Sequence, residues 1–269
     1  MANPFSSGES SARVLGLSSG KGGVGKSTVT VNLALALVGA GHNVGVLDAD
    51  VYGFSVPAML GVPGSAAPAA SGEAVEPVLA HGVRVMSMGF FVPDAQPVIW
   101  RGPMLHKTLE QFLSDVDWGN IDFLLVDMPP GTGDVALSMS QYLPASEVFV
   151  VTTPQAAAKR VAQRSAYMAK KLNLPLRGVI ENMSWLSGAG GEHIPIFGSG
   201  GGAELAAELG VPLLGQVPLE PAVREGGDVG KPVVLADPDS EAAQAFREIA
   251  EHVVKLGRSR VVRKELRIE

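Results

Sequence analysis

Cysteine is absent from the 269 residues of this chain. Its absence excludes disulfide bonds, thiolate metal sites and a cysteine nucleophile. Long apolar runs are also lacking, and none approaches the roughly 18 residues that a membrane-spanning helix needs. The first residues, MANPFSSGESSAR, hold no apolar run of signal-peptide length. We therefore expect a cytoplasmic protein without a transmembrane segment.

Positive charge is also scarce, because 21 Lys and Arg residues face 27 Asp and Glu residues and the formal net charge is −6. Proteins that bind nucleic acid along their surface need clustered positive charge, so no specific nucleic-acid partner is expected. The exception is the basic segment KLGRSRVVRKELRIE at residues 255–269. We interpret it as a solvated helix end or a loose terminus, with a weak contact to an anionic surface as the alternative.

Short β-branched runs alternate with longer helical patterns along the chain. Several strands, such as FLLVDM and EVFVVTT, are apolar on both faces, as strands covered by helices on each side must be. The pattern predicts an α/β fold with a doubly wound, mainly parallel sheet and helices on both faces. The predicted strands are Val14–Ser18, Asn43–Asp48, Val83–Met88, Ile121–Asp127, Glu147–Thr152, Leu176–Glu181 and Leu213–Val217. The predicted helices are Lys26–Gly39, Pro103–Leu113, Val135–Gln141, Ala156–Leu172, Gly202–Leu209 and Ser240–Lys255.

The chain shows no internal repeat and no true linker. We expect one domain at residues 13–256, preceded by a disordered lead-in at residues 1–12 and followed by a basic tail at residues 257–269. Residues 62–77, VPGSAAPAASGEAVEP, are rich in Pro, Ala, Gly and Ser. We interpret this segment as a mobile surface loop rather than a domain boundary.

Residues 19–28, SGKGGVGKST, follow the first predicted strand and lead into a predicted helix, and they match the phosphate-binding pattern G-x-x-x-x-G-K-[ST]. Glycines allow the backbone to turn its N–H groups toward phosphates in conformations that a Cβ would forbid. Lys26 is expected to neutralise charge on the β- and γ-phosphates, and the Ser27 hydroxyl to coordinate Mg²⁺. The predicted nucleotide-binding residues are Gly20, Lys21, Gly22, Gly23, Val24, Gly25, Lys26, Ser27 and Thr28.

A second element, FLLVDMPPGTGD, is an apolar strand that ends in Asp127. A carboxylate at this place is expected to hold the magnesium ion through water. The turn that follows contains Gly131 and Gly133, and a backbone N–H of one of them is predicted to sense the γ-phosphate. Asp134 comes just before the helix predicted from Val135, which makes it a candidate N-cap.

A third element is VLDADVYG, in which Asp48 closes a strand and Asp50 lies just beyond it. In open parallel sheets, ligands bind at this carboxyl edge. Asp50 is therefore a candidate for orienting the water that attacks the γ-phosphate. The alternative is that Asp50 only forms a turn.

The loop GKGGVGKST with its early lysine resembles the deviant Walker motif of the MinD/ParA-like ATPases, which are similar to the SIMIBI-class dimerising NTPases. The segments DADVYGFSVPAML, DMPPGTGD, ENMSW, IFGSGGGAELA and VPLEPAVREGGDVGKPVV together resemble the Mrp/ApbC family of iron–sulfur cluster carrier ATPases. The resemblance covers roughly residues 13–255. It implies ATP and Mg²⁺ as cofactors and a homodimer that encloses the nucleotide.

The resemblance also implies roles for single residues. Lys21 is expected to contact the nucleotide of the partner subunit and to act in catalysis together with Lys26 and Asp50, whereas without the resemblance it would be a solvated loop residue. Asp50 matches the switch-I aspartate of the family, and Asp127 its Walker-B residue.

Base recognition is the other role that the resemblance assigns. Asn182 matches an amide that reads the adenine edge, and an amide can both donate to and accept from adenine. Pro218 begins the loop that packs beside the base. The guanine-reading pattern N/T-K-x-D is missing, so ATP is favoured over GTP.

The chain departs from the family in its possible cluster ligands. Many members carry a Cys-x-x-Cys pair shortly after the NMS segment, but here that segment reads WLSGAGGEHIPIFG and contains no cysteine. Many members also have a small extra N-terminal domain, which we do not expect in this chain. Iron–sulfur clusters take soft thiolate ligands, normally four, and this chain supplies none. An iron–sulfur cluster is therefore implied by the resemblance only. Its five histidines are scattered and do not replace the thiolates: His42, His81, His106, His193 and His252.

Within this segment, His193 is interpreted as a surface or structural residue. The Gly-rich stretch Ser187–Gly191 is expected to be a flexible docking surface for a partner protein.

The leading hypothesis for function is a homodimeric, Mg²⁺-dependent ATP hydrolase of the Mrp type. Such a protein assists iron–sulfur protein assembly by an ATP-driven conformational change, with a scaffold or an apo-protein as partner. The alternative is a MinD/ParA-like positioning ATPase that loads on membrane or DNA when ATP is bound, although the tail offers a membrane only Val261, Val262, Leu266 and Ile268. A regulatory protein with vestigial hydrolysis is the third reading.

Overall fold

A computed structural model describes residues 3–5, 11–50, 53–63, 66, 68–71, 74–91, 102–131, 134–188 and 190–259. Within them an eight-stranded sheet has the order β12-β9-β8-β1-β7-β2-β6-β5, in which every neighbouring pair is parallel except β5 with β6. The predicted doubly wound, mainly parallel α/β fold is confirmed. The strands are β1 (Arg13–Ser19), β2 (Val44–Asp48), β5 (Val78–Ala80), β6 (Val83–Ser87), β7 (Phe123–Asp127), β8 (Glu147–Thr152), β9 (Leu176–Asn182) and β12 (Leu213–Val217).

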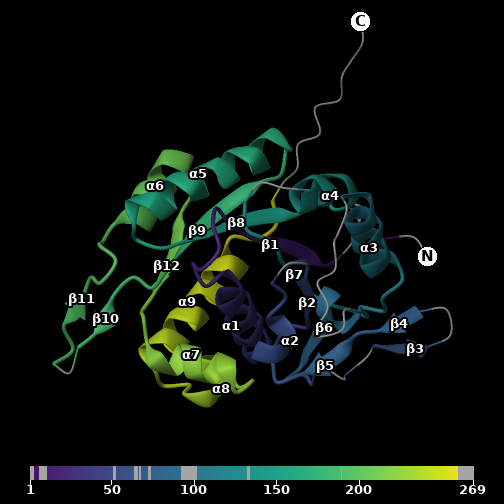
Figure 1. Cartoon of the computed structure of the whole chain (residues 1–269), viewed down its shortest axis with the longest axis horizontal. Coiled ribbons are helices and arrows are strands. Elements are labelled where there is room, and N and C mark those ends of the chain that lie inside the picture. The colour runs from purple at the N-terminus through teal and green to yellow at the C-terminus, as the bar shows by residue number, and fades with distance from the viewer. Residues whose placement is uncertain are drawn as a thin grey trace, which may run out of the picture.

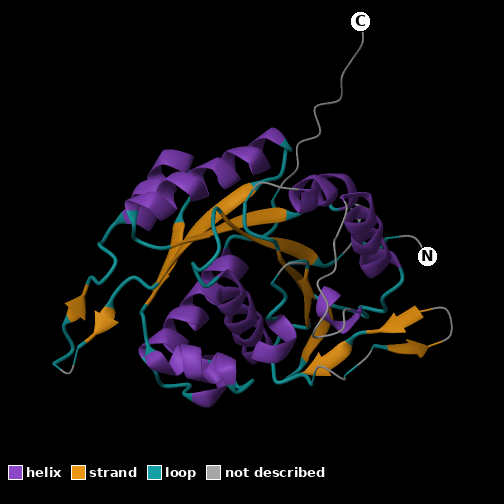
Figure 2. Cartoon of the chain, in the orientation of Figure 1, coloured by secondary structure: helices purple, strands orange, loops and turns teal. Residues whose placement is uncertain are grey.

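Helices cover both faces of this sheet (Figures 1 and 2). Helices α1, α2, α7, α8 and α9 lie on one face, and α3, α4, α5 and α6 lie on the other. Each face has its own apolar core, and the residues of β1, β2, β7 and β8 are all buried between them. The helices are α1 (Lys26–Gly39), α2 (Val56–Met59), the 3₁₀ helix η1 (Met88–Phe91), α3 (Gly102–Ser114), α4 (Asp134–Tyr142), α5 (Ala156–Lys171), α6 (Gly201–Leu209), α7 (Pro221–Asp228), α8 (Val233–Ala236) and α9 (Glu241–Lys255).

Helix α9 packs beside α1 and helps to hold it against the sheet (Figure 1). It begins after Ser240, whose hydroxyl accepts the N–H of Ala243 and so caps the helix. Its apolar residues recur three and four positions apart and form one buried stripe. Phe246, in the middle of the stripe, is fully buried. Because α1 begins at the phosphate-binding loop, this packing fixes the position of that loop.

Two predictions about chain organisation need correction. The segment at residues 62–77, expected to be a mobile loop, contains an antiparallel pair of strands, β3 (Ala69–Ser71) and β4 (Ala74–Glu76). Val75 also exchanges two backbone hydrogen bonds with Asp115 and Asp117, which anchor the pair to the chain after α3. In the expected disordered lead-in, Phe5 is buried in the core below α3 and α4.

Among the helices of the described ranges, none combines the length and the apolar character that crossing a bilayer requires.

The packing of α9 gives a prediction about stability. Phe246→Ala removes a fully buried ring and leaves a cavity between α9, α1 and the sheet, so the free energy of unfolding should fall by about 3–5 kcal/mol. Urea unfolding followed by circular dichroism measures this change. Glu248→Ala, at an exposed position of the same helix, is the matched control and should change stability by less than about 0.5 kcal/mol. Equal stability of the two variants would contradict the described packing.

Candidate functional site

The phosphate-binding loop connects β1 to α1, and two close approaches explain its first and last glycines. A Cβ at Gly20 would lie 2.2 Å from the carbonyl carbon of Val161 in α5. Gly25 has a φ of 77°, and a Cβ there would lie 2.1 Å from Nδ2 of Asn182. No other residue type fits either place without moving its neighbours. Gly22 and Gly23 are exposed, so the loop opens to solvent.

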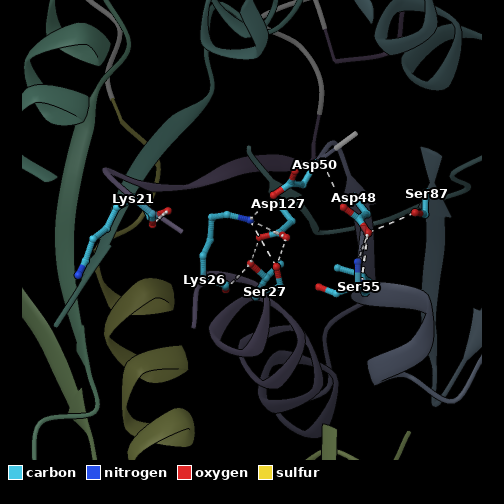
Figure 3. A network of polar contacts seen from close by, with 11 residues as sticks. Lys21, Lys26, Ser27, Asp48, Asp50, Ser55, Ser87 and Asp127 are labelled. Carbon is cyan, nitrogen blue, oxygen red and sulfur yellow. Dashed lines mark hydrogen bonds and ion pairs between the residues drawn. The ribbon is translucent and has the colours of Figure 1, made fainter. Parts of the chain in front are cut away.

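Asp127 is the most tightly held residue of the site. Its carboxylate is fully buried at the end of β7, with Nζ of Lys26 at 2.7 Å. The hydroxyl of Ser27 donates to Oδ2 at 2.5 Å, and the hydroxyl of Thr30 donates to Oδ1 at 2.8 Å. Figure 3 shows the side chains of Lys26 and Ser27 converging on Asp127. The structure thus brings together the predicted phosphate lysine and the two predicted magnesium ligands, while the part played by Thr30 was not predicted.

Asp50 lies farther from Lys26 than Asp127 does. Its Oδ2 atom lies 3.9 Å from Nζ of Lys26, and the residue is 8% exposed. Both side chains line a cavity of about 230 Å³ over the phosphate-binding loop. A carboxylate at the edge of such a cavity can accept a proton from, or orient, a water molecule next to a bound phosphate.

Lys21 has a different orientation from Lys26. Figure 3 shows its side chain extending away from Lys26, Asp50 and Asp127. Its Nζ atom donates to Oε1 of Gln155 at 3.3 Å, just before α5. Within one chain, therefore, Lys21 is part of the loop but does not contact the carboxylates.

A second cavity, of about 460 Å³, adjoins the first, and both are lined by Thr28, Ser55 and Met59. Asn182 and Pro218, the two residues expected to lie beside the base, line the larger cavity. The Nδ2 atom of Asn182 donates to the carbonyl of Val24 at 2.9 Å and so ties the end of β9 to the phosphate-binding loop. This use of the amide was not predicted.

The turn after β7 differs from the sequence-based expectation. The N–H of Gly131, one candidate for sensing the γ-phosphate, donates to the carbonyl of Ser19 at 2.8 Å. Gly133, the other candidate, lies outside the described residues. Helix α4 begins at Asp134 itself, so the prediction that this residue precedes the helix is wrong by one position.

The segment at residues 185–194 forms a small hairpin of β10 (Leu186–Ser187) and β11 (His193–Ile194) rather than a purely flexible stretch. His193 stacks on Trp185, with ring centroids 4.2 Å apart, and its Nε2 lies 3.2 Å from Oε1 of Glu241. Trp185 and Ser187 also donate to the carboxylate of Glu241, at the start of α9. The interpretation of His193 as a structural residue agrees with these contacts. Within the described part of the chain, no group of three or more histidine, aspartate or glutamate side chains is placed to hold a metal ion.

Asp48 is a further acidic residue of the site whose importance the sequence did not reveal. It stands opposite Asp127 in the register of β2 and β7. Burial, and then the charge of Asp127, raise the pKa of the Asp48 carboxyl from 3.8 to about 7, against a smaller effect of backbone hydrogen bonds and of Lys26. Near neutral pH, a substantial fraction of this carboxyl is therefore protonated, whereas an ordinary aspartate is charged.

A glycine-containing loop between a strand and a helix, with a lysine and a hydroxyl facing a buried strand-end carboxylate, defines a P-loop nucleotide-binding protein. The family model for ParA, described as NUBPL iron-transfer P-loop NTPase, matches residues 10–254. The chain belongs to this family, which confirms the resemblance found in the sequence.

Curated relatives and solved structures agree with this assignment. The iron–sulfur cluster carrier protein of Mycobacterium tuberculosis is 48% identical over 254 residues, which is 92% of this chain and 66% of the relative. The carrier of the same name from Synechocystis is 48% identical over 89% of this chain and 69% of its own length. This chain thus spans about two thirds of the length of these relatives.

Among solved structures, a nucleotide-binding protein of Archaeoglobus fulgidus in complex with ADP matches with a TM-score of 0.74 and 32% identity, over 87% of this chain and 92% of that one. The septum site-determining protein MinD of Pyrococcus horikoshii, complexed with Mg-ADP, matches with a TM-score of 0.66 and 28% identity, over 91% and 97%. The fold of this chain is therefore that of nucleotide-binding proteins.

The raised pKa of Asp48 gives a prediction about pH. The folded protein binds this proton more tightly than the unfolded chain, so the contribution of Asp48 to the free energy of unfolding should fall as pH rises from about 4 to about 7. Urea unfolding of the nucleotide-free protein at several pH values, compared with Asp48→Asn, isolates this contribution because all other groups are shared. The variant should gain stability relative to the wild type by more than about 1 kcal/mol across this range. Parallel curves would contradict the raised pKa.

Proposed function

We propose that this protein is a Mg²⁺-dependent ATP hydrolase that acts as a homodimer and assists the assembly of iron–sulfur proteins. The observation that carries the proposal is that Lys26, Ser27 and Asp50 line one cavity over the phosphate-binding loop, while the buried Asp127 holds Lys26 and Ser27 from beneath. The adjoining cavity beside Asn182 and Pro218 has room for a base. Together the two cavities suit one nucleotide, with its base in the larger cavity and its phosphates in the cavity over the phosphate-binding loop.

The oxygen ligands of the site fit a magnesium ion. Mg²⁺ prefers carboxylate, hydroxyl, water and phosphate oxygens and is usually bound through one or two protein groups plus the substrate phosphates. Ser27 would hold it directly and Asp127 through water. Held there, Mg²⁺ would supply positive charge against the negative charge that develops on the phosphates.

The chain's own residues supply the remaining steps. Lys26 leaves its ion pair with Asp127 and places its ammonium group against the β- and γ-phosphates. The N–H groups at the start of α1 add a positive field at the same place. Asp50 orients a water molecule in line with the γ-phosphate, and this contribution belongs to the transition state rather than to nucleotide binding.

A second subunit completes the site. Lys21 belongs to the lining of the cavity, but its side chain extends away from Lys26, Asp50 and Asp127, and its ammonium group donates to Gln155. A cation that crosses a dimer interface can do the work of an arginine finger at the γ-phosphate of the partner. We therefore assign Lys21 to the partner's nucleotide and the homodimer to the nucleotide-bound state.

The role in iron–sulfur assembly rests on the family and on the curated relatives named as cluster carriers. This chain has no cysteine, so a cluster handled by it takes its thiolate ligands from a scaffold, an apo-protein client or a small thiol such as glutathione. The hairpin of β10 and β11 then serves as a docking surface for that partner.

The match to MinD supports a second candidate, a positioning ATPase that loads on membrane or DNA when ATP is bound. Pelleting with liposomes or with DNA, with and without ATP, separates the two candidates. ATP-dependent pelleting would favour the positioning ATPase.

The phosphate lysine gives a first prediction. Lys26→Gln keeps a donor for Asp127 but loses the charge that binds the triphosphate, so the affinity for Mg·ATP should fall about 100-fold. Asp50→Ala is the matched control, because it should keep nucleotide affinity and lose most of the hydrolysis rate. Calorimetric titration and a phosphate-release assay measure the two effects. Wild-type affinity in Lys26→Gln would contradict the assignment of the loop.

Lys21 gives a second prediction. Lys21→Ala should keep nucleotide binding in each monomer but lose ATP-dependent dimerisation and lower turnover about 100-fold or more. Light scattering with a non-hydrolysable ATP analogue reports the dimer. Lys171→Ala, which removes an exposed lysine from the end of α5, should behave as the wild type. A Lys21→Ala variant that dimerises and hydrolyses normally would refute the role across the interface.

The missing thiolates give a third prediction. Anaerobic incubation of the protein with iron and sulfide, followed by desalting, should leave no stoichiometric cluster, because methionine thioethers are its only sulfur ligands. Adding glutathione should be required for any cluster to stay with the protein. Absorption and Mössbauer spectra measure this, and one cluster per dimer without added thiol would show the expectation to be wrong.

A further inference from the structure

The carboxylate of Asp48 is the meeting point of four hydrogen bonds, although it contacts neither Lys26 nor Ser27 at hydrogen-bond distance. Its Oδ1 atom accepts the backbone N–H of Asp50 at 3.2 Å. Its Oδ2 atom accepts the N–H groups of Ser55 and Val56 and the hydroxyl of Ser87, each at 3.2 Å. Figure 3 shows the contacts of Asp48 with Ser55 and Ser87. Three of the four donors thus belong to one segment, which is made of Asp50 and residues 53–56.

This segment carries the groups that face the γ-phosphate in the proposed function. Asp50, Gly53 and Ser55 line the cavity over the phosphate-binding loop. One carboxylate therefore holds both ends of the segment, Asp50 on one side and the start of α2 on the other. Because side chains move with their backbone, the position of the Asp50 carboxylate depends on Asp48.

For the stability of the fold alone, a neutral residue in place of Asp48 would cost less. Asp48 is fully buried and stands one strand away from the buried Asp127. Two buried carboxylates on neighbouring strands repel each other when both are charged, which costs stability. A group that costs stability and yet makes three well-placed contacts to a substrate-facing segment is typical of a functional site.

We propose that Asp48 is a positioning residue that sets the distance between the Asp50 carboxylate and the attacking water by holding the segment made of Asp50 and residues 53–56. This inference deepens the proposed hydrolytic function and rests on it. Misplacement of a reacting group by about 1 Å can lower a rate about 100-fold. The loss of Asp48 should therefore lower kcat without lowering nucleotide affinity, since the phosphate-binding loop and Lys26 do not depend on it.

Asp48→Asn is the test variant, because the amide has the size of the carboxylate but keeps a single acceptor oxygen, which cannot serve both sides of the segment. Ser87→Ala is the matched control, because it removes one hydroxyl donor to Asp48 and leaves the three backbone contacts in place. Three quantities are measured for both variants and the wild type: the affinity for Mg·ADP, kcat with KM for ATP, and amide hydrogen exchange at residues 53–56 without nucleotide.

For Asp48→Asn we expect Mg·ADP affinity within about threefold of the wild type, kcat lower by about tenfold or more, and faster exchange at Ser55 and Val56. Ser87→Ala should resemble the wild type in all three. Unchanged kcat, unchanged exchange, or an equal loss of affinity and kcat in Asp48→Asn would each overturn the proposal. If the wild type hydrolyses no ATP, the proposed function fails by itself, and the exchange of Ser55 and Val56 still decides whether Asp48 holds the segment.

Discussion

The ion pair between Lys26 and Asp127 is the interaction on which the rest of the site depends. Both groups are buried, at 6% and 0% exposure of their side chains, and they lie 2.7 Å apart. A buried ammonium group or carboxylate without a partner is costly, so each needs the other as long as no nucleotide is present. Phosphate and magnesium carry the opposite charges and can replace the two partners, Mg²⁺ at the carboxylate and phosphate at the lysine. In this account, nucleotide binding is an exchange of ionic partners in a site that already exists.

The surrounding fold keeps this exchange local. Gly20 packs against α5 and Gly25 against Asn182, so the phosphate-binding loop is fixed at both ends while its middle stays open to solvent. Asp48 holds the neighbouring segment from the next strand. The side chain of Lys21 extends away from Lys26, and in the proposed homodimer it is the group that the second subunit would engage. A rigid nucleotide site with one lysine available to a second subunit suits a protein whose subunits associate when nucleotide is bound.

The sequence predicted the fold and two of the residues that meet around Asp127, Lys26 and Ser27, because strong local patterns determine both. The bounds of α1 and β8 were predicted to the residue. A glycine-rich loop marks where α1 begins, and β8 is a short apolar run, so few alternatives remain. The sequence could not show contacts that depend on the assembled sheet. Helix α7 is not among the predicted helices, because it contains two glycines. Its Gly226 is needed because a Cβ there would lie 2.6 Å from the carbonyl oxygen of Lys231. In the same way, the four donors around Asp48 come together only after β2 and β6 have paired.

The most direct test of the exchange of ionic partners is a crystal structure of the protein with Mg²⁺ and a non-hydrolysable ATP analogue. The account predicts the phosphates in the cavity over residues 20–28, with Nζ of Lys26 bonded to them and no longer 2.7 Å from Asp127. Ser27 should have left Asp127 and coordinate the magnesium ion. An analogue bound with the ion pair between Lys26 and Asp127 intact, or bound at another place, would contradict the account.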